Sequence, residues 1–477
     1  MVGYKHSHII NILQNMGKLS IFLVVPVLRG LLFTGVGFSE WVSGVWFDLL
    51  IIFCMVGFGF VRWYFNSYQI TNDGINVRRG ILFKKQRFIS YKHLSTMSTH
   101  TPFYFKPINV VRLYADSDAG KRKRHDFSLT IKKSDAEELI RLAGEQFAKS
   151  SKLRREYNPK RGYVTILSII TSNSIGGVLF FSALLSQLGN VMDNELSNKL
   201  VDELTNITKV LAFGVPPVAA VLTYVILAGW VISFVINLLR HYDFSVLRQG
   251  NLLDISMGIV TKRRYKVATG QINLVEAKQN LLTKVLGFFS VFIHTSGYGK
   301  KKHEHSVLIP AADKFQAERN LSILLPEIAM GSLSVKPKKK AIMVFLSLPI
   351  AIIIGIAGIF LFAYWLFPNF NDVIMFLGIM AEIPAIWFLF VKIASFFHTG
   401  IGKQNNVYTL AFTRVFLFYT VAMPKKSVSK IVLKQNLFQK KSKLCDVIIY
   451  SYSEGGKHQK ISGVELQQAK EMFKLPE

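Results

Sequence analysis

The sequence predicts a multi-pass α-helical membrane protein with six spans in three helical hairpins, alternating with three small cytoplasmic α+β domains. Three observations predict this fold class: long apolar runs in pairs, basic segments that separate the pairs, and a polar unit that repeats. Half of the 477 residues are hydrophobic, and 58 Lys and Arg oppose 29 Asp and Glu, for a formal charge of +29. Apolar spans alternating with basic domains against anionic lipid explain both features, so we expect no nucleic-acid partner.

Six apolar runs are long enough to cross a bilayer core of about 30 Å, which requires roughly 20 helical residues. They lie at residues 19–38 and 42–61, 163–188 and 210–239, and 341–367 and 373–397. The linkers within pairs are acidic or neutral, whereas the segments between pairs are rich in Lys and Arg, as in KLRREYNPKR and KPKKK. Because basic segments stay in the cytoplasm, we expect a cell-membrane protein whose N- and C-termini are both cytoplasmic.

This pattern divides the chain into alternating membrane and polar segments. We expect transmembrane pairs within residues 1–65, 151–240 and 331–402. We expect domains at residues 66–150, 241–330 and 403–477, of which the third is divergent. The two Cys residues predict neither a disulfide framework nor a zinc site.

The three polar domains open in the same way, with an aromatic residue in a short alternating stretch that turns into a second apolar strand. The openings are YQITNDGINVRRGILFKKQR from Tyr68, YDFSVLRQGNLLDISMGIVTKRRYK from Tyr242 and YTLAFTRVFLFYTVAMPKKS from Tyr408. Apolar runs of period two follow. Each domain then ends in a helix with a capping-box start, SDAE at 134–137, DKFQ at 313–316 and SGVE at 462–465. Strands closed by one helix predict an α+β unit that is repeated three times.

Over nearly its whole length the chain resembles the bacterial PH-domain membrane proteins of the YdbS/YdbT type, in which transmembrane pairs alternate with pleckstrin-homology-like domains. The most specific feature is a turn with a glycine, RGIL at 79–82 and MGIV at 257–260; the third copy has YTVA at 419–422, without a glycine. The resemblance implies a bent antiparallel sheet of seven strands capped by a C-terminal helix. It also implies a smaller paralogous partner and a role in envelope maintenance or resistance to membrane-active peptides, but no common activity.

Basic residues follow the second strand of each domain, where they could contact anionic head groups of the inner leaflet. The predicted contact residues are Arg78, Arg79, Lys84, Lys85, Arg87, Lys262, Arg263, Arg264, Lys425 and Lys426. Generic electrostatic contact, a defined head-group pocket and charge that only sets topology are three open interpretations of this pattern.

Two ionisable residues interrupt the predicted spans, Arg29 in the first and Glu382 in the sixth. Each costs about 2.5–3.5 kcal/mol at mid-depth. We expect both to face the interior of the helix bundle and to pair. Alternatively, Arg29 reaches a polar boundary and Glu382 is protonated or faces water.

The sequence offers no set of residues typical of catalysis. His303 and His305 flank Glu304, but two imidazoles without a third ligand make a weak metal site, so no metal or cofactor is expected. The leading hypothesis is a non-enzymatic scaffold or accessory protein whose domains contact lipid or a partner protein. The alternatives are a transporter or exporter component that uses the span bundle, and a lipid-modifying membrane enzyme.

Overall fold

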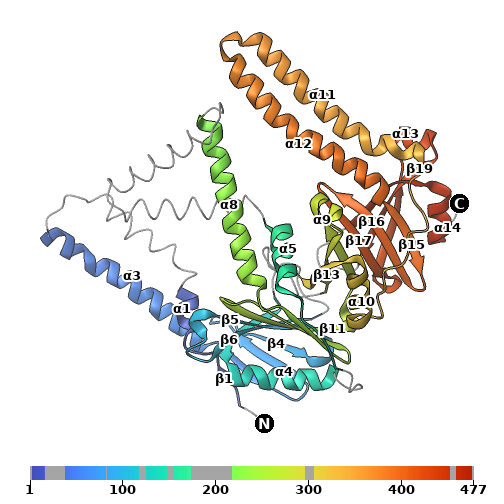
Figure 1. The fold of residues 1–477 in the computed structure, drawn as a ribbon. Coiled ribbons are helices and arrows are strands. Elements are labelled where there is room, and N and C mark those ends of the chain that lie inside the picture. Colours follow the sequence, from blue (N-terminus) through green and yellow to red (C-terminus); the bar gives the residue numbers. More distant parts are fainter. Residues whose placement is uncertain are drawn as a thin grey trace.

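The described strands form four antiparallel sheets, from which long helices rise (Figure 1). The computed structural model describes residues 3–16, 38–81, 83–117, 125–147, 154–172, 217–295, 306–451 and 458–474. Within these ranges the sheets contain four, seven, six and three strands. The prediction of three repeated α+β units is confirmed.

Each repeat contributes six consecutive strands and a closing helix. The first contains β2 (Ser67–Ile70), β3 (Gly74–Arg79), β4 (Lys85–Ser90), β5 (Leu94–Pro102), β6 (Val110–Ser117), β7 (Phe127–Lys132) and α4 (Lys133–Phe147). The second contains β9 (Ser245–Gln249), β10 (Leu252–Met257), β11 (Thr261–Ala268), β12 (Leu274–Gln279), β13 (Phe288–His294), β14 (Val307–Asp313) and α10 (Lys314–Leu324). The third contains β15 (Gly400–Gln404), β16 (Val407–Arg414), β17 (Leu417–Pro424), β18 (Val428–Lys434), β19 (Leu444–Ser451), β20 (His458–Glu465) and α14 (Leu466–Phe473).

A strand that precedes each apolar helical segment joins the sheet that follows that segment. β1 (Lys5–His6) pairs with β2, and β8 (Arg154–Tyr157) pairs with β9. In the third repeat, Val335 and Ile401 exchange two backbone hydrogen bonds of 2.9 and 2.8 Å. Each repeat therefore gains a further extended segment, and both ends of its helical segment are fixed to one sheet.

Neighbouring repeats are joined edge to edge by strands far apart in the sequence. β5 of the first repeat pairs with β11 of the second, from Thr96 opposite Val267 to Pro102 opposite Thr261. The resulting seven-stranded sheet has the order β7-β6-β5-β11-β10-β9-β8. Pairing satisfies the backbone groups that both edges would otherwise expose.

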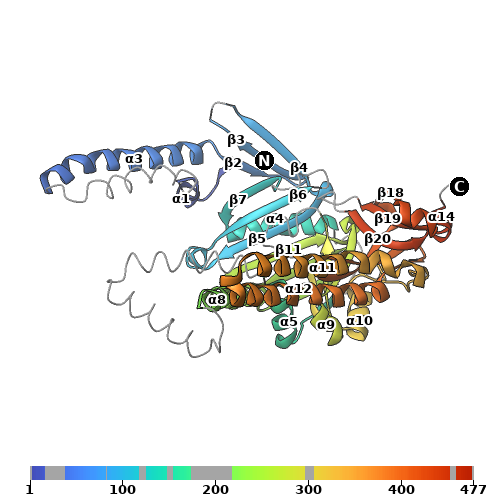
Figure 2. The ribbon, with the colours of Figure 1, turned by 90° about the horizontal axis from the view of Figure 1, so that it is seen from above.

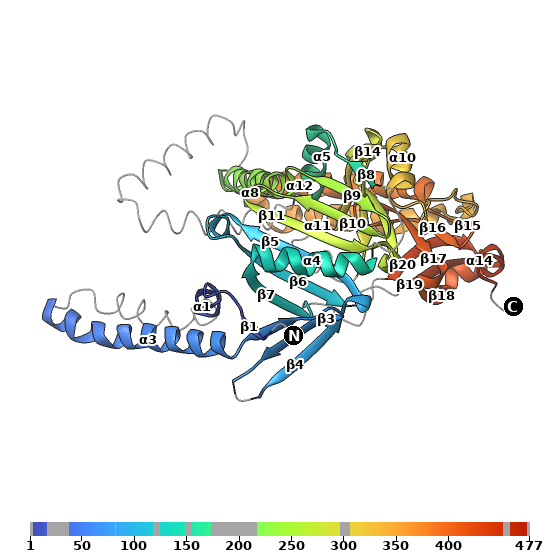
Figure 3. The same ribbon diagram turned by 90° about the horizontal axis from the view of Figure 1, so that it is seen from below.

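The second joint repeats the first. β12 of the second repeat pairs with β17 of the third, and the six-stranded sheet has the order β14-β13-β12-β17-β16-β15. The views from above and below show the repeats following one another along these joints (Figures 2 and 3).

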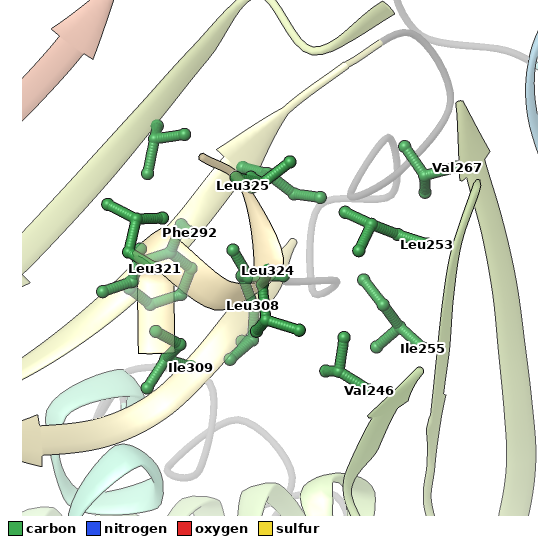
Figure 4. Packing of buried hydrophobic residues seen from close by; sticks show 14 of the residues in the cluster. Val246, Leu253, Ile255, Val267, Phe292, Leu308, Ile309, Leu321, Leu324 and Leu325 are labelled. Carbon is green, nitrogen blue, oxygen red and sulfur yellow. The ribbon is translucent and has the colours of Figure 1, made fainter. Parts of the chain in front are cut away.

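The sheet of each repeat is covered by its closing helix. In the second repeat, Leu321, Leu324 and Leu325 at the end of α10 pack toward the side chains of β13 and β14 (Figure 4). Strands β9, β10 and β11 supply the opposite wall through Val246, Leu253, Ile255 and Val267. Complete burial of each Leu or Ile contributes about 1.5–3 kcal/mol.

The predicted fold class, a six-span helical membrane protein, is wrong. Among the described residues, two helical stretches are long and apolar enough to cross a membrane, Lys339–Leu366 and Pro368–His398. They contain α11 (Ile342–Leu366) and α12 (Asn371–His398), which pack side by side. Helices α3 (Phe38–Tyr64) and α8 (Pro217–His241) contain the shorter apolar stretches Leu50–Tyr64 and Ile226–His241. Other parts of the predicted spans, at 19–37, 173–188 and 210–216, lie outside the described residues.

Helix α5 (Arg161–Thr171) gives a physical reason for this correction. Its apolar residues Val164 and Leu167 are buried in the core of the second repeat, and the Tyr163 hydroxyl donates to Gln316 Oε1 of α10 at 3.0 Å. The start of the predicted third span therefore packs on a domain. Hydropathy measures apolar content, but it does not distinguish burial against protein from burial in lipid.

The predicted helix starts have mixed outcomes. Asp313 caps α10, because its side chain accepts a 2.7 Å hydrogen bond from the Gln316 amide. Ser462 lies within β20, so the predicted capping box of α14 is wrong. Helix α4 begins at Lys133, one residue before Ser134.

The third repeat begins earlier than its sequence pattern suggests. Tyr408 lies in the second strand of its sheet, because β15 precedes it. Residues 419–422 lie inside β17, and the preceding turn is Val415 and Phe416, with Val415 at φ 54°. The comparison of 419–422 with the glycine turns was therefore out of register.

Two repeats share a helical connection that the sequence reasoning missed. The letters KQNL occur at 278–281 and 434–437, where they begin α9 (Leu281–Val285) and α13 (Leu437–Lys441). The Asn280 side chain accepts from the Thr283 amide at 2.7 Å, and Asn436 accepts from Gln439 at the same distance. Reciprocal bonds complete a capping box at both positions.

Candidate anion-binding cleft at the end of helix α3

A cleft of about 620 Å³ opens where the end of α3 meets the first repeat. Its lining residues come from α1 (Asn11–Met16), α3 and the residues that follow it, the β3–β4 hairpin and β7. They are Asn11, Phe58, Arg62, Asn66, Val77, Arg79, Gly80, Ile81, Phe83, Lys85, Arg87, Phe127 and Ser128. Four of these lining residues are Lys or Arg and none is Asp or Glu, so the described walls of the cleft are strongly positive.

Helix α3 brings Arg62 to the cleft in its last turn. The end of the helix is held by α1 and the segment before it: Trp63 Nε1 donates to the Ser7 carbonyl at 2.6 Å, and Tyr64 stacks on His6 with ring centroids 5.6 Å apart. An apolar helix that ends in aromatic and basic residues is typical of a membrane–water interface.

The register of the β3–β4 hairpin places its basic residues on two different faces. Arg79 lies opposite Lys85 and Val77 opposite Arg87, which places the three cations on one face. Arg78 lies opposite Gln86 and belongs to the other face. There its guanidinium carbon is 3.8 Å from the centre of the Tyr4 ring.

The turn of this hairpin requires a glycine. Gly80 has φ 120°, and a Cβ at this position would lie 1.9 Å from the carbonyl oxygen of Phe83. Gly258 occupies the corresponding turn of the second repeat with φ 96°. The glycine turn therefore sets the geometry that places Arg79 and Lys85 beside the cleft.

Backbone carbonyls of β7 and of Asp126, which directly precedes it, orient two of the guanidinium groups. Arg79 Nη2 donates to the Ser128 carbonyl, and Arg87 Nη1 donates to the Asp126 carbonyl at 2.9 Å. Each guanidinium has five N–H donors, so these contacts leave donors for an anion. Burial, followed by the charges of Arg87 and Arg62, lowers the pKa of Arg79.

The cleft is also partly apolar. Phe58, Phe83 and Phe127 contribute aromatic surface, and Phe83 is largely exposed. The lining therefore combines four cationic side chains with aromatic rings.

A family model described as the bacterial PH domain matches three segments of the chain, residues 20–146, 206–328 and 329–475. The chain belongs to the bacterial PH domain family. The resemblance predicted from the sequence and the threefold internal repeat are thereby confirmed. Each matched segment includes one repeat of the structure, so we call the repeats PH domains from here on.

A curated relative supports the membrane character of this bacterial PH protein. The chain is 22% identical over 299 residues to the UPF0699 transmembrane protein YdbT of Bacillus subtilis (strain 168). The alignment spans 58% of this chain and 59% of the relative. No solved structure matches the chain. Together with the two apolar helices, this similarity shows a membrane-associated protein with PH-like domains.

The basic residues predicted in the second PH domain lie in the first joint. Lys262, Arg263 and Arg264 are on β11, which pairs with β5. Arg264 is neutralised by Asp254 through contacts of 2.5–3.0 Å. The backbone of this segment therefore forms the joint, while the side chain of Arg264 forms an ion pair within the second PH domain.

The predicted basic residues of the third PH domain are exposed and lie outside the lining of the described cleft. Lys425 and Lys426 lie in the 3₁₀ turn η7 (Lys425–Ser427). Lys426 Nζ reaches the Gly270 carbonyl of the second domain at 3.3 Å. Lys84 is exposed in the β3–β4 turn. Of the ten predicted contact residues, Arg79, Lys85 and Arg87 line the described cleft.

The sequence reasoning missed Arg62, although a basic residue directly after an apolar run is a recognisable signal. The proposed pair of Arg29 and Glu382 cannot be placed, because Arg29 lies outside the described residues, as do His303 and His305. Glu382 is on α12, where both carboxylate oxygens are buried without a hydrogen-bond partner among the described residues.

Proposed function

We propose that the protein is a non-enzymatic scaffold or accessory protein of the cell membrane whose first PH domain binds the anionic head group of an inner-leaflet phospholipid. The observation that carries this proposal is the convergence of Arg62, Arg79, Lys85 and Arg87 at the end of an apolar helix. Arginine suits this role because its planar donors match the oxygens of a phosphate.

Electrostatics and position both favour a lipid ligand. A basic residue near an anionic membrane surface contributes about 1 kcal/mol, within a Debye length of about 8 Å. The phenyl rings of the cleft would contact the glycerol and upper acyl region while the cations contact the phosphate. A free phosphate would contact only the cations.

The proposal includes a topology. Helices α11 and α12 would cross the bilayer as a hairpin, which returns the chain to the side from which it left. The sheets and their basic residues would face the cytoplasm, in accordance with the positive-inside bias. The N- and C-termini would then both be cytoplasmic, and the protein multi-pass.

The test uses the full chain in a neutral detergent. Titration with phosphatidylglycerol or phosphatidylcholine is followed by the shift in thermal unfolding. We expect saturable stabilisation by phosphatidylglycerol only, and about 10- to 100-fold weaker binding for the double variant Arg79→Gln/Arg87→Gln, because two charge-assisted contacts are lost. Glycerol 1-phosphate in place of the lipid measures the contribution of the head group without the acyl chains.

The matched control is Lys425→Gln/Lys426→Gln, which removes the same charge from the exposed 3₁₀ turn of the third domain. It should change the affinity by less than about threefold, because Lys425 and Lys426 lie outside the lining of the cleft. Equal losses in the two double variants, or equal binding of the two lipids, would refute a head-group site in the cleft.

A further inference from the structure

The first joint between PH domains has a defined register relative to the 3₁₀ turns. Turn η2 (Tyr91–His93) ends at the cap residue Leu94, and turn η4 (Thr269–Gln271) starts after Ala268. Thr96 lies two residues after Leu94, and its partner Val267 lies one residue before Ala268. In this joint, the residue on β5 is therefore one position farther from its 3₁₀ turn than its partner on β11 is from the other turn.

The second joint has the same register. Turn η4 ends at the cap residue Ile272, and turn η7 starts after Pro424. Val275 lies three residues after Ile272, and its partner Ala422 lies two residues before Pro424. The residue on β12 is again one position farther from its turn than its partner on β17 is from the other turn. The two joints are therefore equivalent, although the sequences of the paired strands differ.

The first and third PH domains each have one more strand in a joint position, β4 and β18, at the two ends of the row of domains. β4 corresponds to β11 and β17, and β18 corresponds to β5 and β12. β4 and β18 are each the edge of their sheet among the described strands. The residues of β4 are mostly exposed and those of β18 exposed or half-buried, whereas β5 and β12 are mostly buried. Figure 3 shows the β3–β4 hairpin projecting from the first domain.

We propose that β18 of one chain pairs with β4 of a second copy of this chain, in the register of the two internal joints. This register places Ile431 opposite Phe88 and Val432 opposite Arg87. The contact is head-to-tail, because it joins two different surfaces, so repetition produces a ring or an open chain of copies. Backbone pairing of an added strand supplies the affinity.

The side chain at position 88 supports a second copy as the occupant. Phe88 corresponds to Ala422, which is 0% exposed and packs into the core of the preceding PH domain. Phe88 itself is 57% exposed. Ile431, which corresponds to Val275, packs at the margin of the core of the third domain. Pairing would therefore cover Phe88 with the third domain of the other copy, as the second domain covers Ala422.

Membrane geometry is compatible with this assembly. Helices α8, α11 and α12 leave the sheets on the same side (Figure 1). Copies related by rotation about the membrane normal could therefore all place these helices in one bilayer. The charges at the end of the strands limit the affinity, because Lys434 would lie opposite Lys85; both side chains are exposed and screened.

Association is measured by sedimentation of the full chain in detergent over a range of concentrations. We expect concentration-dependent oligomers for the wild type and at least about tenfold weaker association for Phe88→Asp, because one buried aromatic side chain is lost. Phe315→Asp is the control, because Phe315 is exposed on α10, away from both edges. Circular dichroism establishes that both variants fold.

Cysteine pairs test the register directly. All variants carry Cys54→Ser, because Cys54 is exposed; Cys445 remains, because it is buried and burial raises its pKa to about 11. Mild oxidation should cross-link different copies in Ile431→Cys/Phe88→Cys. It should not do so in Ile431→Cys/Ile89→Cys, because a shift of one residue moves the side chain to the other face.

Three results would overturn the proposal. The first is a monomer at every concentration without cross-linking, including a monomer that associates only with an added single-domain paralogue. The second is equal cross-linking of the two cysteine pairs. The third is efficient cross-linking of Ile431→Cys alone, which would show a symmetric pairing of β18 with β18.

Discussion

Replacement of Glu276 by Ala is expected to destabilise the six-stranded sheet by about 3 kcal/mol, because it leaves the half-buried side chains of Lys278 and His294 without their buried carboxylate partner. Glu276 is 6% exposed on β12, between β13 and β17. Its Oε1 is 2.9 Å from Lys278 Nζ, and its Oε2 is 3.0 Å from His294 Nε2. Hydrogen exchange of the β12 and β17 amides should be about 100-fold faster in the variant.

The matched control is Glu318→Ala, which removes an exposed carboxylate from α10 of the same domain. This variant should change the exchange of β12 and β17 by less than about threefold. Unchanged exchange in Glu276→Ala would show that the buried charges contribute nothing to the joint between the second and third PH domains.

The effect of Glu276 should also depend on pH. Burial by itself would raise the pKa of Glu276, but Lys278 and His294 outweigh it and hold this pKa well below its usual range. Because the folded-state pKa is depressed, the stabilisation is complete above the unfolded-state pKa of about 4.3 and is lost as the pH falls below it. The difference in exchange between wild type and Glu276→Ala, compared at equal pH, should therefore narrow below about pH 4.3.

Replacement of Arg248 by Ala should destabilise the second PH domain by about 3 kcal/mol, because a nearly buried cation joins its sheet to the end of α10. Arg248 Nη1 donates to the Leu324 carbonyl at 2.6 Å, and the guanidinium contacts both carboxylate oxygens of Glu327 at 2.6 and 3.1 Å. The Nε group donates to the Gly250 carbonyl at 2.9 Å. Hydrogen exchange of α10 measures the loss.

Arg248→Lys and Arg319→Ala separate charge from geometry. Lysine retains the charge but not the planar pair of donors, so it should recover less than half of the lost stability. Arg319 is exposed on α10, and its removal should have little effect. Full recovery with lysine would contradict the importance of the two-point contact.

The local parts of the fold could be predicted from the sequence. Alternating strands, the cap at Asp313 and the glycine turn at Gly80 depend on residues within a few positions of one another, and these patterns are visible in the chain. The third domain shows where local similarity failed. Tyr408 matches the aromatic residue that opens the first domain, but it occupies the next strand of the sheet.

The joints could not be predicted in this way. Pairing of β5 with β11 brings together strands more than 150 residues apart, and either strand alone has the composition of an ordinary edge. The ion pair of Arg264 with Asp254 could not be predicted either, because it depends on the register between β10 and β11. Similarly, Arg62 and Arg79 converge only because α3 ends beside the hairpin.

The span prediction was wrong because it considered the length of each apolar run but not whether a protein surface could bury that run. Val164 and Leu167 belong to a run as apolar as a membrane helix, yet they face the core of a PH domain. Composition gives the free energy of leaving water, which is similar for lipid and for a protein core. The packing against β14 and α10 decides between them.

The most direct test of this account asks whether the first and second PH domains share one sheet. Thr101 lies opposite Lys262 across the joint between β5 and β11. In the Cys54→Ser background, the account predicts that Thr101→Cys/Lys262→Cys forms a disulfide within one chain on mild oxidation, identified by peptide mapping of the monomer. It also predicts little disulfide in Thr101→Cys/Arg263→Cys, where the second side chain faces the other side of the sheet. No disulfide in the first variant, or equal yields in both, would contradict the shared sheet.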